Sequence, residues 1–264
     1  MSQTKYEAIG DVAVVTVANP PANLFTAGVM EGLSASLRRA RDEDKRALVI
    51  QADGAVFSGG ADVALFKGTS AVQAREIFEE GTALIAAIED APFPVIAAVH
   101  GLCLAAGLEL ALASDLIIAA EGTQFAQVEA LIGATTFLGG AYRLAERCGS
   151  ARALEITFSG QQYPADTFER WNIINRVVPA EQLRDEALAW AQRLAKGPTR
   201  AHAVTKRLVQ YALTHGPREA DRFLLDGATP LFDTRDMQHA VDLMLTQGSR
   251  KFLQNHGDIV FEGK

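Results

Sequence analysis

The chain has 264 residues, of which 48% are hydrophobic and 22% are charged, and it carries a formal net charge of −7. This length suffices for one large domain, or for one domain with an appendage, and the composition is that of a globular protein with a sizeable core. The acidic balance and the absence of a long basic run argue against binding nucleic acid through a phosphate-facing patch.

The hydropathy pattern and the cysteines bear on the compartment. No uninterrupted apolar stretch reaches about 18 residues, the length that a membrane-spanning helix needs. The first residues, Met1 to Glu7, contain no apolar leader region. Cys103 and Cys148 lie in apolar contexts without metal-ligand spacing, which favours two reduced core side chains. We therefore expect a soluble, cytoplasmic protein that binds no membrane, no nucleic acid and no metal.

The first part of the chain reads as a hairpin, a helix and a buried strand. Apolar runs at 6–9 and 12–17 flank Gly10-Asp11, which predicts a β-hairpin. Asn19-Pro20-Pro21-Ala22-Asn23 predicts a loop, because proline cannot continue a strand. Thr26 can cap a helix, and the run at 47–52 is apolar enough for a parallel sheet that is covered on both faces.

Strands and helices then alternate up to about residue 120. Ser70 can cap a helix whose apolar face includes Ile77, Gly81 and Leu84. A strand at 94–99 is followed by a helix from about Ala105 and by another strand at 114–120. Alternation of this kind is typical of crossover connections between parallel strands, so we predict an α/β fold.

Beyond about residue 138 the chain becomes mostly helical. The exception is a predicted strand at 173–178, and the last predicted helix runs from roughly Arg235 to Leu245. Gly197-Pro198 stops one amphipathic helix, which divides the chain into a sheet-bearing part at 1–195 and a helical part at 196–264. A helical tail of this kind often covers a neighbouring subunit, so we expect an oligomer.

Two turns rich in small residues can expose backbone N–H groups. In Ser58-Gly59-Gly60-Ala61-Asp62, the glycines permit positive φ and close approach of a ligand to the backbone. In Leu104-Ala105-Ala106-Gly107-Leu108-Glu109, a helix begins hard against a strand, and its first N–H groups have no internal acceptor. Either pattern alone also fits an ordinary tight turn or close packing of a helix on a sheet.

Two carboxylates lie in apolar surroundings. Glu109 stands among leucines and alanines, and Glu129 lies between Val128 and Ala130-Leu131-Ile132. A buried carboxylate needs a partner, a raised pKa or a pocket, and a salt bridge or a solvent-facing position would also satisfy each of them. Together with the exposed N–H groups, the two acids are the parts that acid–base chemistry on a polarised carbonyl requires.

Several blocks in a fixed order resemble the crotonase superfamily, the enoyl-CoA hydratase/isomerase family. The blocks are Phe57-Ser58-Gly59-Gly60-Ala61-Asp62-Val63, Pro94-Val95-Ile96-Ala97-Ala98-Val99-His100-Gly101, Glu109-Leu110-Ala111-Leu112-Ala113-Ser114-Asp115, Gln124-Phe125-Ala126-Gln127-Val128-Glu129 and Leu138-Gly139-Gly140-Ala141-Tyr142-Arg143-Leu144. The resemblance implies a crotonase-like fold of stacked ββα units with a helical C-terminal region. It assigns the acyl-CoA site to 1–195 and a trimerisation and lid region to 196–264, in a homotrimer or a dimer of trimers.

The resemblance also implies roles for individual residues. The family's oxyanion hole maps onto the backbone N–H groups of Ala61 and Ala106, and the two acids of its hydratases map onto Glu109, the base, and Glu129, the acid. Substrate-binding positions map onto Ala22, Gly59, Gly60, Asp62, Val63 and Phe137. The implied substrate is an acyl-CoA thioester, so coenzyme A belongs to the substrate and no separate cofactor is expected.

Both acids are present, which favours an enoyl-CoA hydratase that adds water to a 2-enoyl-CoA through a stabilised enolate. The alternatives are another crotonase reaction (enoyl-CoA isomerase, acyl-CoA hydrolase or decarboxylase) and a catalytically weak acyl-CoA-binding subunit. Two departures from the family keep them open. Ala105-Ala106 stands where glycines are usual, and Phe137 replaces a glycine that lines the pocket, where a ring could shorten the acyl site or displace the reactive water.

Overall fold

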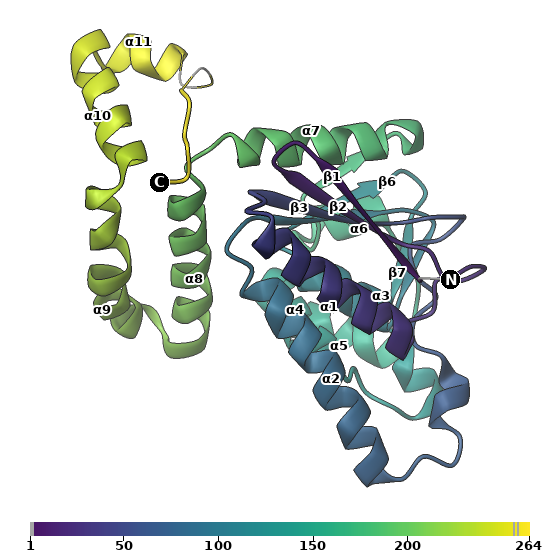
Figure 1. Ribbon diagram of the computed structural model, residues 1–264. Coiled ribbons are helices and arrows are strands. Elements are labelled where there is room, and N and C mark those ends of the chain that lie inside the picture. The colour runs from purple at the N-terminus through teal and green to yellow at the C-terminus, as the bar shows by residue number, and fades with distance from the viewer. Residues whose placement is uncertain (1–2, 256, 258) are drawn as a thin grey trace.

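The computed structural model describes residues 3–255, 257 and 259–264 (Figure 1). Met1 and Ser2, on which part of the expectation for the N-terminal segment rests, lie outside the described residues. A six-stranded sheet forms the centre, in the order β1-β2-β3-β4-β6-β9, and a smaller sheet has the order β5-β7-β8. The strands are β1 (Thr4–Ile9), β2 (Val12–Val17), β3 (Ala47–Ala52), β4 (Val95–Val99), β5 (Leu102–Leu104), β6 (Leu116–Ala120), β7 (Gln124–Ala126), β8 (Tyr163–Pro164) and β9 (Arg176–Val178).

Helices connect the strands and dominate the second half of the chain. The longer helices are α1 (Ala27–Asp42), α2 (Ala71–Glu89), α7 (Leu183–Ala195), α8 (Thr199–His215), α9 (Pro217–Ala228) and α10 (Arg235–Gln247). The shorter ones are α3 (Ala106–Leu112), α4 (Gly140–Cys148), α5 (Ser150–Ser159), α6 (Ala165–Arg170), α11 (Ser249–Gln254) and the 3₁₀ turns η1 (Val63–Phe66), η2 (Glu129–Ile132), η3 (Ala180–Gln182) and η4 (Thr229–Asp233). In the part of the chain that the structure describes, no helix is both long and apolar enough to cross a bilayer.

Side-chain alternation along the central strands explains why both faces of the large sheet are covered. β1 and β2 form the predicted antiparallel hairpin, and β2, β3, β4, β6 and β9 pair in parallel. On β3, Leu48 and Ile50 pack into a core formed with α1, α2 and α3, whereas Ala47 and Val49 face α7. Because successive strand residues point to opposite faces, such near-continuous apolar strands suit a sheet with a layer on each side.

The predicted helix starts for α1 and α2 are confirmed at the level of single atoms. The Thr26 side chain accepts a hydrogen bond from the backbone N–H of Val29. Ser70 and Gln73 form a reciprocal capping box at the start of α2. Each cap satisfies donors that a helix leaves open at its first turn, which is the reason that the two boundaries could be located from the sequence.

Two expectations about the elements were wrong, and the strand β5 was not predicted. The strand expected at 173–178 is only β9, because Ile173 and Ile174 fold back toward Phe168 through backbone hydrogen bonds instead of pairing with β6. The helix expected to be the last is α10, and α11 follows it after Gly248, whose φ of +80° breaks the helix. The segment between β4 and α3 contains a further strand, β5.

Helices α8 to α11 form an arm that stands beside the sheet-bearing body (Figure 1). The Lys206 Nζ atom in α8 lies 2.8 Å from Oδ2 of Asp115, which also accepts a hydrogen bond from the backbone of Val95 in β4. At the base of the arm, Nη1 of Arg46 donates to the carbonyl oxygen of Phe261 at 2.6 Å. The arm is therefore fastened to the body by polar contacts at the end of the sheet.

Candidate active site

The small sheet brings the two turns rich in small residues together. Ser58 pairs with Cys103 of β5, donating from its N–H to the oxygen of Leu102 at 3.0 Å and accepting from the N–H of Leu104 at 3.0 Å. A β-carbon on Gly107 would collide with the Ser58 side chain. Glycine at this position therefore lets α3 begin directly against the segment that carries Ala61.

Ala61 and Ala106 lie at the same cavity, and their backbone N–H groups have no protein partner among the described residues. Both residues line it, and Ala106 is the first residue of α3, where a helix has no internal acceptor. Among the described residues, neither N–H donates to a protein acceptor. By contrast, the N–H of Ala105 is used, because it donates to the oxygen of Ala126 at 2.9 Å. Two N–H groups without a protein partner, on residues that line one cavity, could together serve as an oxyanion hole.

The strained residue at this turn is Ala105, the first of the two alanines that stand where glycines are usual. Ala105 has φ of +49° and ψ of −121°, a combination that favours glycine, and Ala106 is an ordinary helical residue. The helix can begin at Ala106 only because the residue before it turns the chain through this unusual conformation. The alanine that stands in place of a glycine at position 105 therefore strains the backbone, and the N–H of the next residue, Ala106, remains without a protein partner.

Replacing Ala105 by glycine should raise the free energy of unfolding by about 1 kcal/mol, because the strain of a positive φ disappears. Urea denaturation followed by circular dichroism measures the change. Ala111→Gly, inside α3 and with ordinary helical geometry, is the control, and its free energy of unfolding should fall by about 1 kcal/mol. An equal decrease in the free energy of unfolding of both variants would show that Ala105 is not strained.

Glu109 is almost fully enclosed, with 2% of its surface exposed. Its Oε1 atom accepts hydrogen bonds from the backbone N–H groups of Leu138 and Gly140, both at 2.8 Å. Burial raises the pKa of Glu109, and these two donors act in the opposite direction because they favour the ionised form. The loop before α4 thus holds one oxygen of this carboxylate in a fixed position.

Glu129 lies opposite, as the first residue of η2. Burial raises the pKa of Glu129 to about 7, and the negative charge of Glu109 adds to the rise. With the amide of Gln127 assigned so that its nitrogen faces this carboxylate, the nitrogen lies 2.9 Å from Oε1 and 3.0 Å from Oε2. Gln127 is fully buried and is therefore a fixed support for Glu129 that the sequence prediction overlooked.

Replacing Gln127 by methionine should raise the pKa of Glu129 further, because two donors to its ionised form are lost. We expect the limb of the profile of kcat/KM against pH that belongs to Glu129 to move to higher pH. A purely structural role for Gln127 would lower activity equally at all pH values and leave that limb in place. Gln161→Met, at an exposed position, is the matched control.

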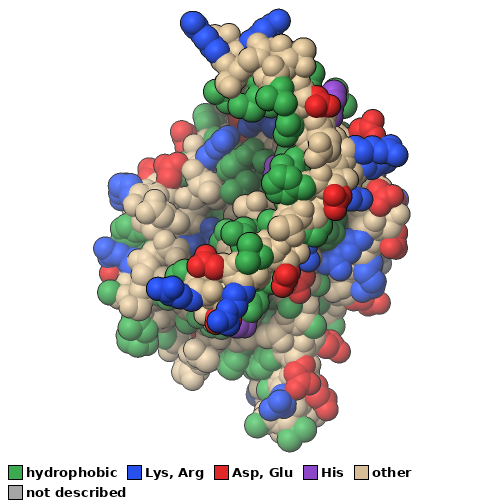
Figure 2. Space-filling view, turned by 90° about the vertical axis from the view of Figure 1, so that its left-hand side faces the viewer, with side chains coloured by type: hydrophobic (Ala, Val, Ile, Leu, Met, Phe, Trp, Pro, Cys, Tyr) green, Lys and Arg blue, Asp and Glu red, His purple; other side chains and the backbone are tan. Residues whose placement is uncertain are grey.

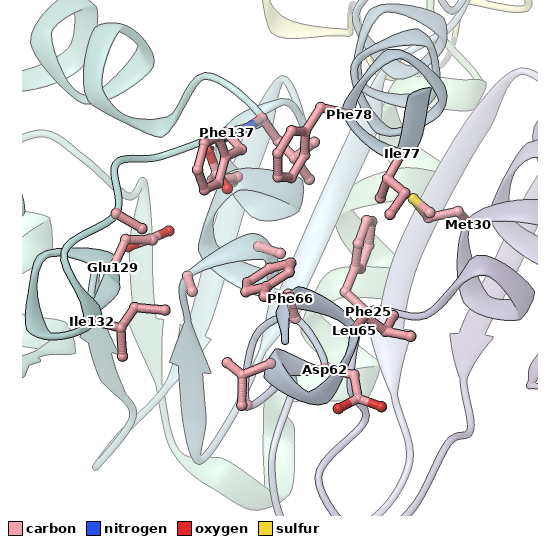
Figure 3. Close-up of a pocket in the computed structure, with 18 of the residues that line it drawn as sticks. Phe25, Met30, Asp62, Leu65, Phe66, Ile77, Phe78, Glu129, Ile132 and Phe137 are labelled. Atoms are coloured by element: carbon pink, nitrogen blue, oxygen red, sulfur yellow. Dashed lines mark hydrogen bonds between the residues drawn. The ribbon is translucent and has the colours of Figure 1, made fainter. Parts of the chain in front are cut away.

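The two carboxylates and the two N–H groups line one cavity of about 300 Å³ (Figure 3). Of the positions predicted from the sequence, those on the cavity wall are Gly59, Ala61, Asp62, Val63, Ala106, Glu109, Glu129 and Phe137. Gly60 lies behind the wall, beside Ala105. Ala22 also lies off the wall, where its carbonyl oxygen accepts the N–H of Gly59 at 2.7 Å.

Aromatic and aliphatic side chains form most of the remaining wall, and the sequence prediction did not name them. They include Phe25, Met30, Leu65, Phe66, Ile77, Phe78 and Ile132. Phe137 stacks against Phe78, with ring centroids 4.1 Å apart and 10° between the ring planes. The Phe137 ring is therefore part of the cavity wall. Its stacking partner could not be found from the sequence, because Phe78 lies on a helix that is far away along the chain.

Comparison with known proteins shows which family the chain resembles over most of its length. The family model described as "Enoyl-CoA hydratase/isomerase" matches residues 7–253. A "Probable enoyl-CoA hydratase" of Rhodobacter capsulatus is 33% identical and covers 80% of this chain and 82% of its own length. A "Carnitinyl-CoA dehydratase" of Salmonella paratyphi A is 30% identical and covers 97% of this chain and 96% of its own length.

The solved structures confirm the predicted fold. The structure of Pseudomonas aeruginosa DspI superposes with a TM-score of 0.89 at 29% identity and covers 94% of this chain and 95% of that one. An enoyl-CoA hydratase subunit from Geobacillus kaustophilus superposes with a TM-score of 0.88 at 30% identity, covering 93% and 95% of the two chains. The crotonase-like α/β fold with a helical C-terminal region, expected from the sequence, is therefore the fold of this chain.

Proposed function

The chain belongs to the enoyl-CoA hydratase/isomerase family, and from that premise we propose that it adds water across the double bond of a 2-enoyl-CoA. One observation carries the proposal. One buried carboxyl group, one half-buried carboxyl group and two residues whose backbone N–H groups have no protein partner line the same apolar cavity. Family membership makes the protein an enzyme of the crotonase superfamily, and the pair of acids favours hydration within it.

The backbone donors act on the thioester carbonyl. The oxygen of the bound thioester accepts hydrogen bonds from the N–H groups of Ala61 and Ala106. When water attacks the β-carbon, the electrons of the double bond move toward this oxygen and form an enolate. Donors that are already in place stabilise that charge without reorganising, which is why such sites lower the barrier strongly.

The carboxyl groups move the two protons. The ionised Glu109 takes a proton from the water molecule while the oxygen of that water bonds to the β-carbon. Glu129, protonated, gives its proton to the α-carbon as the enolate collapses, so that the net change is the addition of one water molecule. The pKa of about 7 for Glu129 and the two N–H donors to Glu109 support this division. Because the two charges interact, the pair titrates as a unit.

A spectrophotometric assay tests the proposal. Hydration removes the conjugation of a 2-enoyl thioester, so purified protein should abolish its ultraviolet absorbance. A 3-enoyl-CoA that gains this absorbance would show that the protein is an isomerase. Tight binding of CoA esters without any turnover would show an acyl-CoA-binding subunit instead.

The pH dependence follows from the raised pKa of Glu129. Activity that needs a protonated Glu129 should fall as pH rises through about 7. The fall should be seen in kcat/KM, because this ratio reports the free enzyme.

The free energy of unfolding should also fall as pH rises. The pKa of Glu129 is higher in the folded protein than in the unfolded chain, so its protonation favours the folded state. This contribution to the free energy of unfolding is complete below the unfolded pKa and is lost as pH rises through about 7. Kinetics and urea denaturation between pH 5 and 9 measure both, and activity that rises through pH 7 would contradict the assignment.

We also propose that residues 196–264 serve trimerisation and act as a lid, in a homotrimer or a dimer of trimers. Figure 2 faces the arm and shows hydrophobic side chains along these helices and around a hollow beside them. Hydrophobic residues of this part of the chain with large exposed fractions include Leu213 (57%), Leu225 (64%), Phe232 (62%) and Leu245 (79%). Apolar exposure on this scale is typical of a surface that another chain covers. Light scattering of the purified protein should give the mass of three or six chains, and the mass of one chain would overturn this proposal.

A further inference from the structure

Two stacked phenylalanine rings line one part of the cavity wall, and one of them, Phe137, is 37% exposed. Phe78 comes from α2 and Phe137 from the loop before α4, and their rings lie face to face (Figure 3). Phe66 of η1 is the next ring, with its centroid 6.4 Å from that of Phe78. Three separate elements therefore contribute aromatic rings to one part of the wall.

This part of the wall offers an incoming group little besides apolar contact. The other acidic side chains that line the cavity are Asp62, which accepts a hydrogen bond from the N–H of Ala64 to cap η1, and Glu80, which is solvent-exposed on α2. Lysine, arginine and histidine are absent from the cavity wall in the part of the chain that the structure describes. A charged or strongly polar acyl end would lose hydration here without gaining a partner.

The ring pair is fixed to the loop that holds Glu109. A β-carbon on Gly81 would lie 2.5 Å from Cδ2 of Leu138, so α2 packs tightly against this loop one helical turn beyond Phe78. The N–H of Leu138 in turn donates to Oε1 of Glu109. Neighbouring residues of one loop thus line the cavity and hold the carboxylate, so we expect a shift of the backbone at Phe137 to disturb the Glu109 hydrogen bond.

We propose that the Phe78–Phe137 pair sets the length of the acyl group, and that the substrate carries an unbranched, apolar acyl chain of about eight to twelve carbons. This inference rests on the proposed function, because it places the thioester at Ala61 and Ala106. An engineered cavity of about 150 Å³ holds one benzene molecule, which corresponds to about 25 Å³ per carbon atom. On that scale the cavity of about 300 Å³ accommodates about twelve carbons.

The length dependence follows from burial and from the shared loop. A four-carbon acyl group leaves the phenylalanine-lined end unfilled, and each added methylene should strengthen binding up to about fourfold until the cavity is full. A longer chain must displace the Phe137 ring, and the Leu138 N–H moves with it. Beyond the fitting length, kcat should therefore fall.

The experiment separates acyl-chain recognition from hydration. Saturated acyl-CoA thioesters of 4 to 16 carbons cannot be hydrated, and calorimetry gives their Kd values. We expect affinity to rise with each methylene and to level off at about eight to twelve carbons. Equal affinity for the four-carbon and ten-carbon thioesters would overturn the inference. Affinity that keeps rising to sixteen carbons would also overturn it, by showing that the chain continues into the groove between α1 and α2, which shares Ala27 and Met30 with the cavity.

Variants test whether the ring pair is responsible. In Phe137→Ala and in Phe78→Ala, the acyl length at which affinity levels off should increase by two or more carbons. Phe158→Ala, which removes an exposed ring on α5, should leave this length unchanged. Circular dichroism checks that each variant is folded, and Phe137→Leu gives a second, milder change at the same position. An unchanged limit in all folded ring variants would overturn the proposal. If the wild-type protein shows this graded binding yet hydrates none of the matching 2-enoyl thioesters, the proposed function fails while the length-setting role stands.

Discussion

Replacing Glu129 by glutamine should lower turnover of a 2-enoyl-CoA by about 10²–10⁴-fold while leaving the fold intact. The amide has nearly the shape of the carboxyl group but carries no proton that it can give to the α-carbon. The side chain lies partly exposed at the start of η2, so the backbone has no need to move. Stopped-flow or steady-state absorbance measurements give kcat, and thermal unfolding checks the structure.

The expected signature of this variant goes beyond a lower rate. Since the group with a pKa of about 7 is removed, the fall in kcat/KM through that pH should disappear from the residual activity. Glu121→Gln, at an exposed turn, is the matched control and should behave like the wild type. Full turnover in Glu129→Gln would mean that this carboxyl group has a structural role only.

Local chemistry explains what could be predicted of the fold. Thr26 and Ser70 were identified as helix caps because a cap needs only a suitable side chain next to an apolar periodic run. The buried strand at 47–52 was recognisable because its apolar run is short and continuous. β5 was missed because its three residues owe their conformation to pairing with Ser58 and with β7, which are contacts between distant parts of the chain.

The same distinction applies to the site. Glu109 and Glu129 stood out because carboxylates are rare in apolar surroundings, and Ala61 and Ala106 were assigned through the family resemblance. Gln127 was overlooked because nothing in its sequence context shows that its amide reaches Glu129. Phe137 was expected at the pocket, but its stacking on Phe78 could not be foreseen, because Phe78 lies on a helix that is distant along the chain.

The strained turn illustrates a limit of transferring a motif. The alanines at 105 and 106 occupy positions where glycines are usual, and the sequence cannot say which of the two needs the positive φ. The backbone assigns it to Ala105, whose N–H is already bonded to Ala126. The free donor at Ala106 keeps ordinary helical geometry, so the departure from the family bears on stability more than on the oxyanion contact.

Replacing Glu109 by glutamine should also lower turnover by about 10²–10⁴-fold, because the base that takes the proton from water is lost. The substitution is nearly isosteric, and the amide oxygen can accept the N–H groups of Leu138 and Gly140 as Oε1 does. At pH 8 the variant should be at least as stable as the wild type, since a neutral amide is cheaper to bury than a carboxylate. Urea denaturation tests this, and Glu76→Gln on the exposed face of α2 is the control.

The double variant decides whether the two acids work as a pair. If water attack and protonation of the α-carbon are coupled steps of one reaction, losing the second acid costs little once the first is gone. Glu109→Gln with Glu129→Gln should then lower kcat by much less than the product of the two single losses. A loss equal to that product would mean that the two carboxyl groups contribute independently, and the proton transfers would have to be assigned to separate steps.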